Sequence, residues 1–480
     1  MARSITAEEK QYAHELLARA RRAMAAIEDY DQVRIDRLCQ AVGWATANET
    51  TFTRLAYMSV DESGLGDRKG RPNKRFKIMG ILRDALRQKS MGIIEEIPDK
   101  GIAKYAKPVG VVASLVPVTN AALTEAGNGI YALKCKDAII FSPHPASSKT
   151  TNETVRIMRA ALKKEGAPED LFQCIEKPSI PLAQELMAIC DLTIATGGPA
   201  MVRAAYSSGK PAYGVGAGNA TMVIDETANI EEAARNTRIS KTSDNGSGCS
   251  SDGNLLVEAS IYDRFLGQLQ AEGGYLVSEE EKRKLQGVMW DSEGHRTAPT
   301  IARPAARIAE LAGFAIPVDK TFLVVKEERI GKENLFSSEK LSPVLAIFKY
   351  SGFENALTMV KQIYEVGGKG HSCGIYSFHD GHIHSLALTA PVSRIMVRQP
   401  QSKANAGAFN NGMPMTSSMG CGTWGGNIIS ENVCLKHYMN TTWVSVPIKE
   451  DKPSDKELFG AFYDPAMELY DTVEAPTAEV

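Results

Sequence analysis

The sequence predicts an α/β fold in which two doubly wound parallel sheets form two lobes and a small β-flap lies outside both. Short apolar runs alternate with helix-like segments from Gly110 onward, a pattern typical of strands buried on both faces. The alternation resumes after Cys249, which indicates a second sheet. A chain of 480 residues is also long for one hydrophobic core, so more than one domain is expected.

The first region predicts helices that serve packing. Thr6 and Glu9 have the spacing of a capping box, and apolar residues then recur at helical spacing. Strands of the first lobe are expected at 110–116, 138–141, 192–195 and 221–224, with helices at 121–133, at 154–162 and from 200.

The second set of strands is expected at 254–257, 344–348, 374–378 and 395–398. Residues 95–101 suggest a hairpin outside both lobes, and 441–446 suggest a strand that joins it. The predicted division is 1–91 with 109–236 for the first lobe, 237–430 for the second lobe, and 92–108 with 431–480 for the flap and a C-terminal tail. This boundary would place Cys249 in the cleft between the lobes, where ligand sites usually form.

Composition excludes several classes of partner. Lys and Arg number 55 against 57 Asp and Glu, and the net charge of -2 argues against nucleic-acid binding by phosphate neutralisation. No apolar run is long enough to span a bilayer, and the N-terminus lacks a signal-peptide core, so we expect a cytoplasmic protein without a membrane partner. Eight cysteines without a CxxC pair indicate neither a disulfide framework nor a metal site.

Cys249 is the candidate nucleophile because it lies in a run of small polar residues, 243–251, instead of on an apolar face. Gly246 and Gly248 would let backbone N–H groups approach a developing oxyanion. The alternative is a Gly/Ser surface loop that merely contains a cysteine.

Turns at the expected carboxyl ends of strands supply further candidates. Asn120, after Pro117 and Thr119, could donate its amide to an oxyanion, although the same turn could simply cap a helix. Thr196-Gly197-Gly198 could present N–H groups to a phosphate or nicotinamide, or could be a tight turn.

The strand expected at 138–141 is followed by Ser142, Pro143 and His144, with no carboxylate in that segment. A ribose 2′-phosphate would therefore meet no repulsive anion, and both NAD and NADP are physically allowed. The alternative for His144 is an exposed loop histidine.

An ordered set of motifs resembles the CoA-acylating branch of the aldehyde dehydrogenase superfamily. The resemblance runs from about residue 101 to 446 and is more specific than any one motif. Its segments are 117–120, 142–145, 196–198, 214–219, Cys249, 339–343 and 420–427.

The resemblance implies that the first lobe binds the nucleotide, the second is catalytic, and the β-flap joins subunits into a homodimer or homotetramer. Cys249 would be the nucleophile, and Asn120 with the Cys249 backbone N–H would form the oxyanion hole. Glu339 would hold the nicotinamide ribose, with a solvated helix-end carboxylate as the alternative. NAD or NADP would be the cofactor and CoA the co-substrate. The implied cofactor contacts are Pro117, Thr119, Ser142, His144, Thr196, Gly197, Gly198, Gly214 and Glu339.

One departure from the hydrolytic relatives bears on the reaction. Those enzymes carry a glutamate in the glycine-rich motif before the cysteine, and this chain has Gly214 there. Without a carboxylate base, water should attack an acyl-cysteine slowly, which leaves time for the CoA thiol.

His371 follows a glycine-rich turn and matches a histidine of the acylating branch, so it is the candidate for proton transfer, with a structural histidine as the alternative. His379, His382 and His384 lack a carboxylate or cysteine partner at helpful spacing and predict a polar turn that enters a helix. Cys421 is a second possible reactive thiol or a close-packed loop residue. Cys135, between two lysines, is expected to be structural.

Thr242, Asn245 and Ser247 precede the nucleophile and favour a small polar or anionic aldehyde. The resemblance of the overall pattern to members of the acylating branch implies sulfoacetaldehyde as the first choice, succinate semialdehyde as the second and acetaldehyde as the third. A catalytically silent nucleotide-binding or assembly scaffold stays open as another class. In either case the tail near 455–463 could dock the protein, for example in a bacterial protein compartment.

Overall fold

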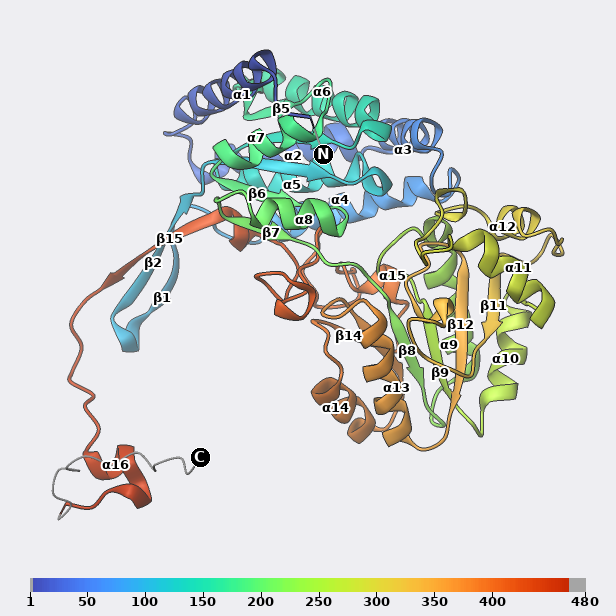
Figure 1. Ribbon diagram of the computed structural model, residues 1–480. Coiled ribbons are helices and arrows are strands. Elements are labelled where there is room, and N and C mark those ends of the chain that lie inside the picture. The colour runs from blue at the N-terminus through green and yellow to red at the C-terminus, as the bar shows by residue number, and fades with distance from the viewer. Residues whose placement is uncertain (1–2, 466–480) are drawn as a thin grey trace, which may run out of the picture.

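Two parallel sheets and one antiparallel sheet organise the chain (Figure 1). The computed structural model describes residues 3–465. The first sheet has five parallel strands in the order β5-β4-β3-β6-β7. They are β3 (Val111–Val116), β4 (Ala138–Pro143), β5 (Phe172–Cys174), β6 (Leu192–Ala195) and β7 (Ala212–Gly214). All residues of β3, β4 and β6 are buried, as expected for strands covered on both faces.

Helices cover the first sheet. The α5 and α6 helices pack together against β3, β4 and β5, whereas α1 and α7 pack together against β3. As predicted, α1 begins at a capping box formed by Thr6 and Glu9. The helices of this lobe are α1 (Ala7–Ala25), α2 (Gln32–Ala47), α3 (Glu49–Ser63), α4 (Arg75–Leu86), α5 (Leu123–Lys134), α6 (Ser148–Lys164), α7 (Ile180–Ile189) and α8 (Pro199–Tyr206).

The second sheet has seven parallel strands in the order β10-β11-β12-β9-β8-β13-β14. Its strands are β8 (Thr221–Ile224), β9 (Asn254–Glu258), β10 (Gly274–Leu276), β11 (Phe322–Lys326), β12 (Val344–Tyr350), β13 (Cys373–Tyr376) and β14 (Ile395–Val397). The placement of the 221–224 strand in the first lobe is therefore wrong, because β8 pairs with β9 and β13. The chain leaves the first sheet after β7, well before the boundary expected at residue 236.

The helices of the second lobe are α9 (Ile230–Thr242), α10 (Tyr262–Ala271), α11 (Glu279–Met289), α12 (Ala305–Leu311), α13 (Phe353–Val366) and α14 (Asp380–Thr389). After β14, the short α15 (Gln401–Ala404) packs against α9. No helix within residues 3–465 is both long and apolar enough to cross a membrane.

The third sheet projects from the first lobe (Figure 1). It is the antiparallel order β1-β2-β15, formed by β1 (Gly92–Ile97), β2 (Ile102–Pro108) and β15 (Met439–Ser445). This confirms the hairpin and the strand expected to join it. Val433, Cys434, Leu435 and Tyr438, however, pack into the hydrophobic core of the first lobe instead of belonging to the flap or tail. Beyond the flap, α16 (Asp455–Phe459) lies apart from both lobes in Figure 1.

Candidate active site

Cys249 follows a tight turn that contacts the first lobe. The turn begins where α9 ends, and Asp244 and Asn245 both adopt left-handed backbone conformations, with φ of 51° and 52°. Asp and Asn tolerate this conformation better than most residues. The Asn245 amide donates to Gly66 O at 3.0 Å, and the Asp67 N–H donates to the Asp244 carboxylate at 2.7 Å. The turn therefore lies where the two lobes meet, as the cleft prediction requires.

Asp244 binds two cations of the first lobe. Its carboxylate accepts hydrogen bonds from Arg71 at 2.8 Å, from Lys74 at 2.7 Å and from Ser247 Oγ at 2.9 Å. The Arg71 and Asp244 side chains are only 2% and 6% exposed. Burial alone would raise the pKa of the Asp244 carboxyl, but the charges of Lys74 and Arg71 hold that pKa well below its usual value. This buried ion pair fixes the turn that carries the thiol.

Cys249 and His371 lie in direct contact. His371 Nε2 is 3.0 Å from Cys249 Sγ, and His371 Nδ1 is 2.9 Å from Ser372 Oγ. The histidine precedes β13 and is 1% exposed, and Arg394 Nη1 donates to its carbonyl oxygen at 2.8 Å. The structure thus brings the predicted nucleophile and the predicted proton-transfer residue together.

Burial determines the protonation states of this pair. It lowers the pKa of His371 to about 3, helped by the charge of Arg394. It raises the pKa of Cys249 to about 12, helped by Glu339 and Cys421, while Arg394 acts in the opposite direction. At neutral pH the pair is therefore a thiol and a neutral imidazole.

Glu339 lies beside the cysteine segment. Its Oε1 accepts a hydrogen bond from the Gly218 N–H at 3.1 Å, and a Cβ on Gly218 would come within 1.8 Å of Cys249 O. Burial raises the pKa of Glu339 to about 7, against hydrogen bonding from Gly218 and the charges of nearby cations. A carboxylate therefore does lie near the thiol, with one oxygen held by the Gly218 backbone.

Gly214 does not face the thiol. It ends β7, its N–H donates to Tyr206 Oη at 2.9 Å, and an added Cβ would meet Val202 and Tyr206. A side chain at 214 would point toward α8 and away from Cys249. The choice between hydrolysis and transfer to CoA therefore cannot be inferred from the residue at this position alone. The broader observation holds, because residues 214–219 contain no carboxylate.

The predicted cofactor segments share one edge of the first sheet. Pro117, Ser142 and Thr196 stand at the carboxyl ends of the adjacent parallel strands β3, β4 and β6. The strand order reverses between β3 and β6, the position at which open α/β sheets usually bind ligands. An added Cβ on Gly198 would meet nothing within 4 Å, so the approach to the N-terminus of α8 is open there. An added Cβ on Gly197, by contrast, would come within 2.8 Å of Met201 Sδ.

Two expectations about the end of β4 change in the folded chain. His144 caps the next helical turn, since its Nδ1 accepts the Ala146 N–H at 3.1 Å. Glu62 accepts the N–H groups of Lys149 and Thr150 at 2.8 Å each, at the N-terminus of α6. The expectation that no anion lies near this segment is therefore wrong, because α3 supplies one from outside it.

Asn120 reaches the cysteine turn through Lys74. Lys74 Nζ donates to Asn120 Oδ1 at 2.6 Å and makes a longer contact with Thr119 O at 3.4 Å. Because the amide oxygen faces the ammonium group, the amide nitrogen points elsewhere and keeps its donors. The same lysine donates to Asp244, so Asn120 and the turn are fixed by one cation.

The three predicted substrate contacts already have protein partners. Thr242 Oγ1 donates to Arg238 O at 2.8 Å, Asn245 binds Gly66, and Ser247 donates to Asp244. These side chains shape the turn. The sequence interpretation missed Arg71, Lys74 and Arg394. The basic run at 68–77 is the signal that could have found the first two, and Arg394 carries no comparable local signal.

The remaining singled-out residues lie elsewhere. His379 caps α14 as the polar-turn interpretation expects, but His382 does have a carboxylate partner, with its Nδ1 2.8 Å from Asp225 Oδ2. Asp225, Glu226 and His382 place ligand atoms within 4.8 Å of one another and could hold a metal ion. Sequence spacing could not reveal this group, because 157 residues separate His382 from Asp225.

Cys421 and Cys135 are both buried. An added Cβ on Gly216 would come within 2.7 Å of Cys421 Sγ, which matches a close-packed loop residue. Burial raises the pKa of the Cys135 thiol well above its usual value, and the charge of Lys134 does not offset this. Cys135 is therefore structural, as expected.

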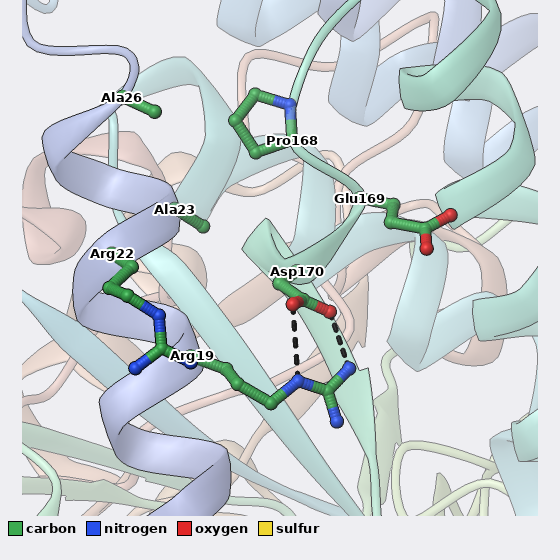
Figure 2. A pocket seen from close by; sticks show the side chains of 7 residues that line it. All are labelled: Arg19, Arg22, Ala23, Ala26, Pro168, Glu169 and Asp170. Carbon is green, nitrogen blue, oxygen red and sulfur yellow. Dashed lines mark hydrogen bonds and ion pairs between the residues drawn. The ribbon is translucent and has the colours of Figure 1, made fainter.

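A surface groove is formed by residues 19–26 and 168–170 of the first lobe. Figure 2 shows it between α1 and the turn before β5, lined by Arg19, Arg22, Ala23, Ala26, Pro168, Glu169 and Asp170. Arg19 and Asp170 form an ion pair across it at 2.5 Å. None of the candidate catalytic residues lines this groove.

Known proteins share both the sequence and the fold of this chain. The model of the aldehyde dehydrogenase family matches residues 2–286. The chain is 45% identical over 451 residues to a sulfoacetaldehyde dehydrogenase of an Acholeplasma species, which covers 93% of each protein. It is 40% identical over 449 residues to a sulfoacetaldehyde dehydrogenase (acylating) of Bilophila wadsworthia, covering 92% of this chain and 97% of that one. It also resembles the crystal structure of an acetylating aldehyde dehydrogenase from Geobacillus thermoglucosidasius, with a TM-score of 0.89, 36% identity and coverage of 93% and 99%.

Proposed function

Because this chain belongs to the aldehyde dehydrogenase family and is an NAD(P)-dependent oxidoreductase of its CoA-acylating branch, we propose that its aldehyde is sulfoacetaldehyde. The membership expected from the motifs, the fold class and the reaction class are thereby confirmed. The observation that carries the chemistry is the 3.0 Å contact between Cys249 Sγ and His371 Nε2.

Proton transfer begins the reaction. In the tautomer whose Nδ1–H is donated to Ser372 Oγ, His371 Nε2 has a lone pair directed at the thiol and takes its proton. The sulfur then adds to the aldehyde carbon and forms a thiohemiacetal. The Asn120 amide and the Cys249 N–H are the proposed donors to its oxygen.

NAD(P)⁺ supplies the hydride acceptor, which leaves a thioester on Cys249. Pro117, Thr196 and Gly198 at the sheet edge and Glu339 beside the thiol are the residues we assign to hold it. Before CoA reacts, His371 releases to solvent the proton that it took from Cys249. The CoA thiol then gives its proton to His371 while its sulfur attacks the thioester carbon. The C–S bond to Cys249 breaks, and the proton passes from His371 to the leaving Cys249 sulfur. The preference for CoA over water as the acyl acceptor is supported by the acylating relatives.

The test is aldehyde- and CoA-dependent NAD(P)H formation by the wild type, by Cys249→Ala and by Cys421→Ala as the matched thiol control. We expect Cys249→Ala to lose activity by about 10⁴-fold or more while it still binds cofactor. Cys421→Ala should keep its thioester product. Formation of free acid at full rate without CoA would identify a hydrolytic enzyme instead, and cofactor binding without turnover of any short aldehyde would identify a silent scaffold.

The cellular setting is part of the same proposal. We infer a homodimer or homotetramer assembled through the β-flap and working in the cytoplasm. The docking role expected for the tail, including docking in a bacterial protein compartment, is supported by exposed Leu458, Phe459 and Phe462. Residues 466–480 lie outside the described part of the chain.

A further inference from the structure

Cationic side chains from two distant segments gather beside the turn that leads to Cys249. Arg71 and Lys74 precede α4 and share the Asp244 carboxylate. Lys77 lies one turn further along α4. Lys403 comes from α15, and its Nζ donates to Ser243 Oγ at 2.7 Å.

Two of these cations lack a carboxylate partner. Lys77 Nζ donates to the carbonyl oxygens of Ala406 and Gly407. Lys403 has its contact with Ser243. Neither lysine forms an ion pair with any residue in the range 3–465. Arg71, Lys74, Lys77 and Lys403 together therefore carry more charge than Asp244 can neutralise.

Other carboxylates near the cluster offset only part of this charge. Asp67 faces Lys403, and Asp84 faces Lys77 but is already paired with Arg83 at 2.7 Å. Burial and the charge of Lys403 together lower the pKa of Lys77 to about 8. Burial likewise lowers the pKa values of Lys74 and Lys403. The cluster is thus a partly desolvated positive site that an anion would stabilise.

We propose that Lys74 and Lys403 bind the anionic group of the aldehyde substrate, with Lys77 adding positive charge behind them. The inference rests on the proposed function, because it concerns the far end of the aldehyde that Cys249 attacks. In sulfoacetaldehyde one methylene separates the sulfonate from the carbonyl carbon. The anion must therefore bind next to the group that holds the carbonyl oxygen, and Lys74 contacts Asn120, the side chain proposed for that role.

Lys403 is the residue of this site whose substitution best tests recognition of the anion. It forms no hydrogen bond with Cys249, His371 or Asn120 themselves, and its contact is with Ser243 Oγ at the start of the turn. Lys74 is 23% exposed and also holds Asn120 and Asp244, so its substitution would disturb catalysis with every aldehyde. Lys403 variants therefore separate anion recognition from the chemistry.

The experiment compares kcat/KM for sulfoacetaldehyde, succinate semialdehyde and uncharged propanal, with CoA and NAD(P)⁺, at low ionic strength. The proteins are the wild type, Lys403→Gln, Lys403→Glu and the control Lys361→Gln, which removes an exposed lysine from α13. We expect Lys403→Gln to lower kcat/KM for sulfoacetaldehyde about tenfold and Lys403→Glu to lower it more, with propanal changed less than about twofold. Added salt should shrink the difference.

The possible results separate the two claims. If the ratio of kcat/KM for sulfoacetaldehyde to that for propanal is the same in both Lys403 variants as in Lys361→Gln, the anion site is overturned while the enzyme assignment stands. If succinate semialdehyde alone responds, the site takes a longer carboxylate substrate and the sulfonate assignment is wrong. If the wild type makes no thioester from any of the three aldehydes, the proposed function itself fails.

Discussion

At the scale of single residues, the thiol and the imidazole are kept neutral by burial. The pKa of Cys249 is raised to about 12 and that of His371 is lowered to about 3, so both groups are uncharged at neutral pH. The His371 ring is therefore unprotonated across the neutral range. A permanently ionised thiolate would not need it.

We predict that His371→Ala lowers kcat/KM at pH 7 by about 10²- to 10⁴-fold, because the thiol then loses the imidazole nitrogen that lies 3.0 Å from its sulfur. The deficit should shrink as the pH rises, since more of the raised-pKa thiol ionises without help. The measurement is the pH profile of CoA-dependent NAD(P)H formation, with exposed His384→Ala as the control. A deficit that stays constant with pH would mean that His371 is structural.

Much of this site could be predicted from residue types. A cysteine among small polar residues and a histidine after a glycine-rich turn identify themselves by local composition. Lys74 and Glu62 do not, because each acts on a segment that only folding brings near. The polar side chains of Thr242, Asn245 and Ser247 suggested substrate contacts, but their hydrogen bonds are used within the protein.

At the scale of elements, Gly218 controls how closely two loops approach. An added Cβ would lie 1.8 Å from Cys249 O, and this neighbour is backbone that cannot rotate away. The glycine therefore sets the position of the nucleophile from the opposite loop.

Gly218→Ala should push the cysteine segment out of place. We expect at least about a 100-fold loss of kcat and a lower free energy of unfolding by about 1–3 kcal/mol, as for other overpacked sites. Activity assays and thermal unfolding would measure both. The matched control is Gly267→Ala in α10, where an added Cβ meets nothing within 4 Å and helix propensity favours alanine by about 0.5–1 kcal/mol. Equal behaviour of the two variants would contradict this account.

Element type was predicted better than sheet membership. β3, β4, β9 and β12 have enough consecutive apolar residues to be found from sequence. β5, β7 and β10 have three residues each, too few to show a period. β8 was found but assigned to the wrong sheet, because a buried parallel strand looks the same in either lobe and only its pairing with β9 and β13 decides.

At the scale of the whole molecule, the β-flap exposes apolar side chains away from both lobes. Trp443 and Val444 on β15 are 59% and 44% exposed, and Val446 follows them. Contiguous apolar side chains on a projecting sheet usually mark an interface.

Val444→Asp should therefore lower the mass of the particle in solution, because it would bury a carboxylate at the contact. Light scattering after size-exclusion chromatography would measure this, with Thr441→Asp on the opposite face of β15 as the control. A wild type with the mass of one chain would rule out the assembly proposal.

The ion pair between Arg71 and Asp244 also limits how this enzyme can be recombined with its relatives. A chimaera that joins residues 217–400 to the first lobe of a relative would contain Cys249 and Asp244. It would lack Arg71 and Lys74, whose charged groups hold the turn before the cysteine. Such hybrids should also include residues 66–77 from this chain, so that both partners of the ion pairs come from the same protein.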